Sequence, residues 1–307
     1  MNITTQVRKI INHYEGESPG IKANLYRILM SGKLAGTGKL LILPIDQGFE
    51  HGPIKSFASN VAAYDPHYHF NLAIEGGLSG LAAPLGILQA GCDSFAGQIP
   101  MILKLNNNNS LVSNTDIPDQ AFTSSVQDAV RIGCIGVGIT IYPGSDKFLE
   151  MLEETQKIIR EARNYSLITV IWSYPRGKNL TKICETAIDI CSYAAHIAAL
   201  IGAHIIKVKL PTQNISQIKN QDLLSNKNTK IDTLTERIKH VMQSCFNNKR
   251  LVIFSGGQYK SESDLLDEVK SIKDGGGSGS IIGRNAFQRP KFEALTLLSK
   301  ICNIYRN

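Results

Sequence analysis

The sequence predicts a single (β/α)8 TIM barrel with an N-terminal helical extension. Three observations lead to this fold class. Strand and helix patterns alternate along the chain, the strands are almost continuous apolar runs, and eight strand-helix units follow one another within about 270 residues. Apolar strands of this kind are typical of a parallel sheet that is covered on both faces. We therefore expect an extension over residues 1–35, packed on a barrel domain over residues 36–307.

The elements follow from these patterns in chain order. The first strand is the apolar run before Asp46, and the others are expected at Gly80–Pro84, Met101–Asn106, Cys134–Tyr142, Leu167–Gly177, Gly202–Pro211, Arg250–Gly257 and Ser278–Asn285. Helices are expected at Ile21–Leu29, Pro66–Glu75, Leu85–Phe95, Val126–Ile132, Asp146–Asn164, Leu180–Ile201 and Asp232–Phe246, with two more around the eighth strand. Residues 46–53, 106–109 and 212–230 are expected to be loops.

An open doubly wound sheet is the alternative. No G-x-G-x-x-G follows the first strand, and polar residues stand at nearly every strand end instead of at one switch point. Both observations favour closure, although periodicity alone does not prove it.

Composition limits the function classes. With 43% hydrophobic and 19% charged residues, the 307-residue chain resembles soluble globular proteins. Charges interrupt the apolar runs of the N-terminus and no segment is apolar enough for a bilayer, so we expect no signal peptide, no membrane contact and a cytoplasmic location. The net charge of +7 suits an anionic substrate, whereas the lack of Lys/Arg-rich blocks argues against nucleic acid. The six scattered cysteines are expected to be reduced.

Two lysines interrupt the apolar strand GAHIIKVKLP. Lys207 and Lys209 stand two residues apart, so their side chains share one face of the strand. Burial and mutual repulsion would lower their pKa values and yield a nucleophilic amine. The alternative is structural, with one or both ammonium groups reaching water or pairing with a carboxylate.

Polar residues gather at the C-terminal strand ends, where barrels place their active sites. They are Asp46, Lys104, Asn106, Tyr142, Trp172, Tyr174, Arg176, Lys207, Lys209, Ser255-Gly256-Gly257 and Gly283-Arg284. The last two groups follow strands seven and eight, the usual phosphate position in barrels, although Ser-Gly-Gly is also compatible with a plain tight turn.

An amine, a carboxylate, a phenol and a phosphate cradle together indicate carbonyl chemistry on a sugar phosphate. An iminium formed by the amine would withdraw electrons while a neighbouring C–C bond breaks. Tyr174 fits the acid/base for the substrate hydroxyl, and Asp46 fits the proton shuttle during dehydration. Each could instead be a structural hydrogen-bonding residue.

The stretches LPIDQGFEHGP, WSYPRG, GAHIIKVK, SGGQ and GRNAFQRP, in this order, resemble the archaeal-type class I fructose-1,6-bisphosphate aldolases, a family also found in bacteria. The similarity covers roughly residues 21–301. The resemblance implies cleavage of fructose 1,6-bisphosphate in glycolysis or its reverse in gluconeogenesis, through a lysine Schiff base and without a metal or other cofactor. It also implies a homo-oligomer, often a decamer.

The resemblance assigns roles residue by residue. Lys207 corresponds to the Schiff-base lysine, Tyr174 to the acid/base and Asp46 to the assisting carboxylate, with Trp172 shaping the same wall. For substrate binding it implies His51 at one phosphate and Arg176 at the far end. Backbone at Gly256, Gly257, Gly283 and Arg284, next to Ser255, would hold the other phosphate. Lys209, on the same strand face as Lys207, is expected to lower the pKa of Lys207 or to contact the substrate.

Three alternatives stay open. Related Schiff-base enzymes carry out aldol, transaldol or thiolytic steps on other sugar phosphates. A zinc aldolase would need a histidine set, and the only close pair, His67 and His69, is expected on a helix surface. A non-catalytic barrel could bind a phosphosugar or a protein, but binding alone does not require an amine inside the sixth strand.

Overall fold

Eight parallel strands close into one barrel in the order β1-β10-β9-β8-β7-β6-β3-β2. The architecture comes from a computed structural model that describes residues 2–111, 117–217, 219, 221 and 230–307. The strands are β1 (Leu40–Pro44), β2 (Gly80–Ala83), β3 (Met101–Lys104), β6 (Gly136–Ile141), β7 (Ile168–Ser173), β8 (Ile205–Val208), β9 (Leu251–Ser255) and β10 (Gly279–Ile281). Because β1 pairs with β10, the sheet has no free edge, which confirms the predicted barrel and excludes the open sheet.

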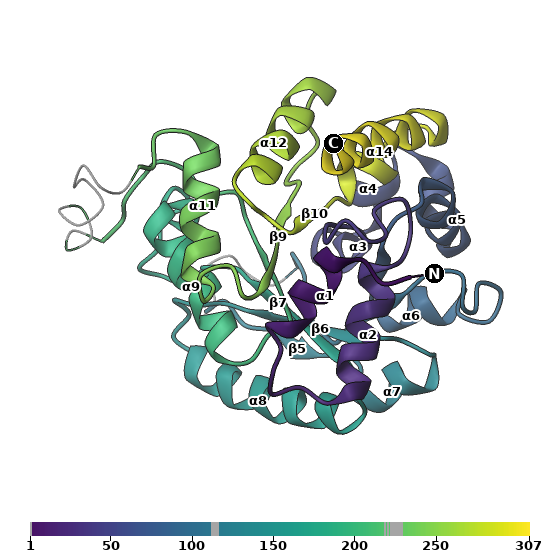
Figure 1. The fold of residues 1–307 in the computed structure, drawn as a ribbon, viewed down its shortest axis with the longest axis horizontal. Helices are drawn as coiled ribbons and strands as arrows, with labels where there is room; N and C mark the ends of the chain where they lie inside the picture. Colours follow the sequence, from purple (N-terminus) through teal and green to yellow (C-terminus); the bar gives the residue numbers. More distant parts are fainter. Residues whose placement is uncertain (1, 112–116, 218, 220, 222–229) are drawn as a thin grey trace.

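Helices surround the strands (Figure 1). The larger ones are α2 (Pro19–Leu29), α5 (Pro66–Gly76), α8 (Phe148–Asn164), α9 (Ile188–Leu200), α11 (Leu234–Ser244), α12 (Glu262–Asp274) and α14 (Lys291–Arg306). Shorter ones are α1 (Thr5–Asn12), α6 (Leu85–Gln89), α7 (Val126–Arg131), α13 (Arg284–Phe287), and the 3-10 turns η1 (Val61–Tyr64) and η2 (Cys184–Thr186). In α8 the buried residues Met151, Thr155, Ile159 and Ala162 recur with helical spacing, so one stripe faces the barrel.

Two expected loops contain secondary structure. Residues 46–53 form α3 (Gln47–His51) and the start of α4 (Pro53–Phe57), which Gly52 separates at a φ of 79°. Asn106–Asn107 is strand β4, paired antiparallel with β5 (Ala121–Phe122). The asparagines tolerate this buried position because the Asn106 amide donates to Thr140 O at 2.8 Å and the Asn107 amide donates to Thr123 Oγ1 at 2.7 Å.

Two expected helices are shorter than predicted. The helix expected over Leu85–Phe95 ends at Gln89, and the one expected over Leu180–Ile201 becomes η2 followed by α9. Much of the segment 212–230 lies outside the described residues; within its described part, Thr212 bridges Ala187.

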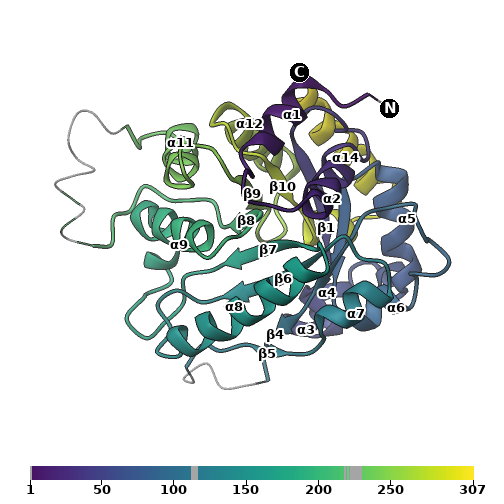
Figure 2. The same ribbon diagram turned by 60° about the horizontal axis from the view of Figure 1, so that its bottom comes forward.

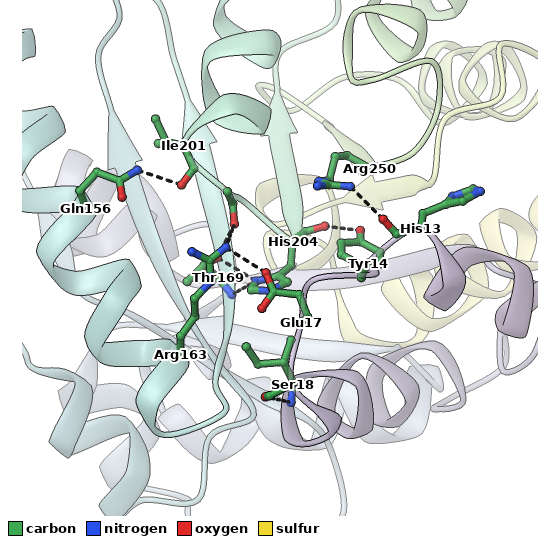
Figure 3. A network of polar contacts seen from close by, with 12 residues as sticks. His13, Tyr14, Glu17, Ser18, Gln156, Arg163, Thr169, Ile201, His204 and Arg250 are labelled. Atoms are coloured by element: carbon green, nitrogen blue, oxygen red, sulfur yellow. Dashed lines mark hydrogen bonds and ion pairs between the residues drawn. The ribbon is translucent and has the colours of Figure 1, made fainter.

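The residues before β1 cover the N-terminal end of the barrel. The Tyr14 hydroxyl donates to His204 O at 2.6 Å, and Arg250 donates to His13 O at 3.3 Å (Figure 3). The Asn24 amide donates to Ser166 O at 2.8 Å. Figure 2 shows α1 at one end of the molecule and α3, β4 and β5 at the other. The C-terminal ends of the strands lie at the opposite end of the barrel.

Two further expectations concern compartment. All six cysteines are free thiols, as expected. Within the described ranges, no helix combines the length and the apolar character that a membrane span requires.

Candidate active site

A cavity of about 440 Å³ opens at the C-terminal ends of the strands. Ten of the predicted site residues line it: Asp46, His51, Tyr174, Arg176, Lys207, Lys209, Ser255, Gly257, Gly283 and Arg284. They come from the ends of β1, β7, β8, β9 and β10, which lie far apart in sequence. Trp172 and Gly256 do not line the cavity. The Gly256 N–H donates to Ile281 O at 3.1 Å, so the sheet already uses it.

Lys207 is the residue at the centre of this cavity. It is only 4% exposed, and its Nζ lies 5.0 Å from the centroid of the Trp172 ring and 5.4 Å from that of Tyr174. Trp172 is itself buried in β7 opposite Lys207 in the strand register. Gly138 on the neighbouring strand makes room for the indole, since a Cβ there would lie 2.4 Å from Trp172 Cζ3. The packing therefore fixes where the amine stands.

The electrostatics of Lys207 differ from the prediction. Burial disfavours its charge, but Tyr174, Asp46 and Glu50 outweigh burial and raise the pKa of Lys207 above its ordinary value. The prediction of a lowered pKa was wrong because it omitted the carboxylates and the phenol that meet the amine. Burial raises the pKa of Tyr174, which hydrogen-bonds to Lys207. Before substrate binds, Lys207 is therefore an ammonium and Tyr174 a neutral phenol.

Lys209 does not act on Lys207 as predicted. Its Nζ forms an ion pair with Glu185 Oε2 at 2.8 Å, and Lys182 contacts the other oxygen of Glu185 at 2.8 Å. Lys209 Nζ also lies 5.9 Å from the centroid of the Tyr174 ring. The second lysine of the strand therefore lines the cavity with its charge already compensated.

The helix after β1 contributes two carboxylates and a histidine. Asp46 is buried at the start of α3, and Glu50 and His51 follow within the same helix. His51 Nε2 lies 3.8 Å from Glu50 Oε2. Burial, and then the charges of Arg284, Lys55 and Arg176, lower the pKa of His51, although Glu50 opposes them. His51 is therefore neutral at pH 7 and can donate or accept a hydrogen bond.

Positive charge exceeds negative charge around the cavity. Six lysine and arginine side chains line it, namely Lys55, Arg176, Lys207, Lys209, Lys260 and Arg284, against the three carboxylates Asp46, Glu50 and Glu268. The excess of three suits a ligand with several negative charges.

Arg176 is held at the edge of the cavity by aromatic contacts. Its guanidinium donates to the Tyr142 hydroxyl at 3.0 Å and lies 4.8 Å from the ring centroid. Gln120 also donates to that hydroxyl. Burial raises the pKa of Tyr142 to about 12, so Tyr142 is a neutral support for Arg176.

Comparison with known proteins identifies the family of this chain. Residues 40–289 match the DeoC/LacD family aldolases. The chain is 37% identical over 296 residues to a Chlamydia muridarum protein named as a probable fructose-bisphosphate aldolase class 1, covering 92% of this chain and 83% of that one. It is 36% identical over 256 residues to the class 1 fructose-bisphosphate aldolase of Thermoproteus tenax, covering 83% and 86%.

The chain belongs to the DeoC/LacD aldolase family. An archaeal fructose-1,6-bisphosphate aldolase, solved with its catalytic lysine covalently bound to the carbinolamine intermediate of the substrate, has the same fold. That structure superposes on this aldolase with a TM-score of 0.76 at 32% identity, covering 92% of this chain and 98% of that one.

The predicted phosphate loops of this aldolase are tightly packed. A Cβ at Gly283 would lie 2.8 Å from Pro44 O and 2.8 Å from Gln47 Nε2, so only glycine lets β10 approach the end of β1. Gly257 has a φ of 71°, its N–H donates to Ser255 Oγ at 3.3 Å, and its carbonyl accepts from Arg284 at 3.3 Å. The two loops therefore reach each other directly at the cavity wall.

Two residues near Lys207 were given no role from the sequence, although Lys104 was among the polar residues expected at the strand ends. Glu50 lines the cavity and raises the pKa of Lys207. Lys104 is buried, donates to Asn106 Oδ1 at 3.0 Å and lies 5.8 Å from the Trp172 ring centroid. Burial lowers the pKa of Lys104 to about 8, and the charge of Lys207 contributes. The lysine inside an apolar strand was a visible signal for Lys104, whereas Glu50 stood in an expected loop.

The histidine pair of the zinc alternative lies away from this site. His67 and His69 are on α5, and His69 is 1% exposed instead of lying on the helix surface. It is buried because its ring packs near Phe57 and Phe287, with centroids 5.7 and 5.5 Å away, and its Nε2 bonds to Ala63 O at 2.8 Å.

Proposed function

We propose that this aldolase reversibly cleaves fructose 1,6-bisphosphate to dihydroxyacetone phosphate and glyceraldehyde 3-phosphate through a Schiff base on Lys207. One observation carries the proposal. A buried amine meets a phenol and two carboxylates inside a cavity with an excess of three positive charges. A substrate with two phosphates, each near −2 at neutral pH, matches such a cavity.

The first step is attack on the ketone. Because the pKa of Lys207 is raised, its proton has to leave before Nζ can attack C2, and Asp46 and Glu50 are the acceptors that act on it. Addition gives a carbinolamine, and a proton delivered by the same carboxylates lets its hydroxyl leave as water. The product is an iminium on Lys207.

The iminium then accepts electrons from the C3–C4 bond. The positive charge on Lys207 favours loss of the Tyr174 proton to water, and the resulting phenolate takes the proton of the C4 hydroxyl as that bond breaks. Glyceraldehyde 3-phosphate leaves, and the enamine remains on Lys207. Return of the proton to C3 restores the iminium, and one water hydrolyses it to dihydroxyacetone phosphate and the free amine.

The cavity offers a place for each phosphate. Ser255, Gly257, Gly283 and Arg284 line one wall, and His51 stands near Arg284. Arg176, fixed by Tyr142, is the candidate for the other end. Lys209, two residues after Lys207, is a candidate substrate contact. The centroid of the Trp172 ring lies 5.0 Å from the Lys207 amine, and the ring helps to position it. Gly256 would contribute by shaping the loop.

The proposal also includes the cofactor, assembly, location and domain organisation expected from the sequence and from the family resemblance. The reaction uses no metal and no other cofactor, the protein acts as a homo-oligomer in the cytoplasm, and residues 1–35 form an extension of the catalytic barrel 36–307. In this chain one histidine, His51, and three carboxylates share the cavity with six lysine and arginine side chains, whose positive charge disfavours a bound zinc ion.

The direct test is turnover of fructose 1,6-bisphosphate, followed by coupled detection of both triose phosphates, before and after treatment with excess EDTA. We expect cleavage, and full activity after EDTA. Cleavage of a different sugar phosphate alone would replace the substrate assignment, and strong inhibition by EDTA would contradict the Schiff-base route.

A further inference from the structure

A second cavity of about 190 Å³ lies at the N-terminal end of the barrel, opposite the candidate active site. Gln6, Lys9, Ile10 and His13, in and just after α1, line one side. Lys39, Lys249 and Arg250, which precede β1 and β9, line the other, next to Ser278. No residue of this cavity has a part in the proposed reaction.

The lining is strongly cationic. Lys9, Lys39, Lys249 and Arg250 contribute four positive charges, and no aspartate or glutamate lines the cavity. Within the described ranges, none of these four residues takes part in an ion pair. Solvated surface lysines usually lie near carboxylates, so an uncompensated group of four around a cavity points to an anion.

Two of the cations are held in place. Lys39 Nζ donates to Gly277 O at 2.6 Å. Arg250 donates to Lys249 O at 2.8 Å and to His13 O at 3.3 Å, and its guanidinium lies 5.1 Å from the centroid of the Tyr14 ring (Figure 3). Since these contacts fix the charged groups before a ligand arrives, binding costs less side-chain entropy.

The local electrostatics agree with a positive field. Burial, and then Lys249, Lys9 and Arg250, lower the pKa of His13, while Glu15 has the smaller, opposite effect. Burial and the charge of Lys273 lower the pKa of Lys39. An anion in the cavity would relieve both effects.

The turn before β9 has a left-handed backbone. Phe246, Asn247 and Asn248 have φ values of 57°, 52° and 67°. Asparagine adopts this conformation readily, so the unfavourable position is that of Phe246. This turn places Asn248, Lys249 and Arg250 at the cavity.

We propose that this cavity is a binding site for a small phosphorylated anion. Lys39 and Arg250 are its fixed contacts, and Lys9 and Lys249 close over it from α1 and from the turn before β9. The volume is well below that of drug-sized ligand sites, which fits an anion with one or two phosphate groups and little else. The ligand would link α1 to the starts of β1 and β9. The site is separate from the active site, so the proposal does not depend on the proposed reaction.

Inorganic pyrophosphate is a suitable probe. Isothermal titration calorimetry and hydrogen exchange, both at about 0.15 M salt to screen nonspecific attraction, would compare the full chain with the double variant Lys9→Gln/Lys249→Gln. The matched control is Lys157→Gln/Lys270→Gln, which removes the same charge from exposed positions on α8 and α12. Arg284→Gln separates binding at the candidate active site.

We expect pyrophosphate to protect residues 5–13 and 246–251 from exchange in the full chain, in the control and in Arg284→Gln. In Lys9→Gln/Lys249→Gln this protection should be lost and the affinity of this site should fall about tenfold or more. An absence of binding, protection confined to the candidate active site, or equal affinity in the two double variants would overturn the proposal.

Discussion

The two ends of one strand segment carry buried ionisable residues with opposite surroundings. His204 stands just before β8 at the closed end, and Lys207 stands within β8 near the open end. The groups that face the two ring nitrogens of His204 belong to the protein itself. Its Nδ1 accepts from Thr169 N at 2.9 Å, so the ring proton is on Nε2, which faces Glu17 Oε1 at 3.3 Å (Figure 3).

Lys207 borders a cavity instead. Its neighbours Tyr174, Asp46 and Glu50 line that cavity, so a substrate can enter between them. Burial alone thus does not separate structural from chemical residues. The difference is whether protein groups alone surround the buried residue, as at His204, or whether a ligand can reach it, as at Lys207.

The largest effect is expected for Lys207→Met. Without the amine no iminium forms, so kcat/KM for fructose 1,6-bisphosphate should fall at least about 1000-fold. Lys209→Met removes a proposed substrate contact but not the nucleophile, so it should lose far less activity than Lys207→Met. Greater loss in Lys209→Met than in Lys207→Met would reverse the assignment.

Tyr174→Phe should separate cleavage from Schiff-base formation. Removing the acid/base is expected to lower kcat about 100- to 10,000-fold. Dihydroxyacetone phosphate should still be trapped on the enzyme by borohydride, because Lys207 is intact. Unchanged turnover would exclude Tyr174 as the group that takes the hydroxyl proton.

Lys104→Met tests the second buried lysine of the open end. With a pKa of about 8, Lys104 is mostly charged at pH 7, and this charge opposes a charge on Lys207. Its removal should raise the pKa of Lys207 further and move the acidic limb of the pH-activity profile to higher pH by about one unit. Lys55→Met removes a more exposed charge from the cavity and should move the limb less. A shift to lower pH in Lys104→Met would contradict this role.

The smallest effect on activity is expected at the closed end. The hydrogen bond from His204, with Arg163 nearby, lowers the pKa of Glu17 to about 2. A lowered carboxyl pKa stabilises the fold above the ordinary value near 4.5, and this contribution is lost as the pH falls from about 5 towards 2. Glu17→Gln should therefore lower the free energy of unfolding by about 2 kcal/mol at pH 7 and flatten its dependence in that range.

Chemical denaturation between pH 2 and 7 measures this effect, with Glu15→Gln as the control. The kcat of Glu17→Gln should stay close to that of the natural protein. A large loss of kcat with unchanged stability would mean that the closed end takes part in the chemistry.

The repeating patterns made the barrel predictable. Eight apolar strands, each followed by a helix, favoured a closed barrel, and the structure has one. The predicted strand ends also placed Lys207, Tyr174 and Asp46 together, and all three line the cavity. What the sequence could not show was pairing. The ion pair between Lys209 and Glu185, the position of Glu50 at the cavity and the pairing of Asn107 with Ala121 depend on contacts between segments distant in the chain or on local helix geometry.

The pKa of Lys207 illustrates the same limit. Its burial could be predicted from GAHIIKVKLP, but the carboxylates that outweigh burial come from the segment after β1, more than 150 residues earlier in the sequence.

The account depends most on which lysine bonds to the substrate. Borohydride reduction in the presence of dihydroxyacetone phosphate, followed by peptide mass spectrometry, identifies that residue directly. We predict one adduct per chain, on Lys207, and none in Lys207→Met. An adduct on Lys209 or Lys104, or no adduct at all, would contradict the central claim.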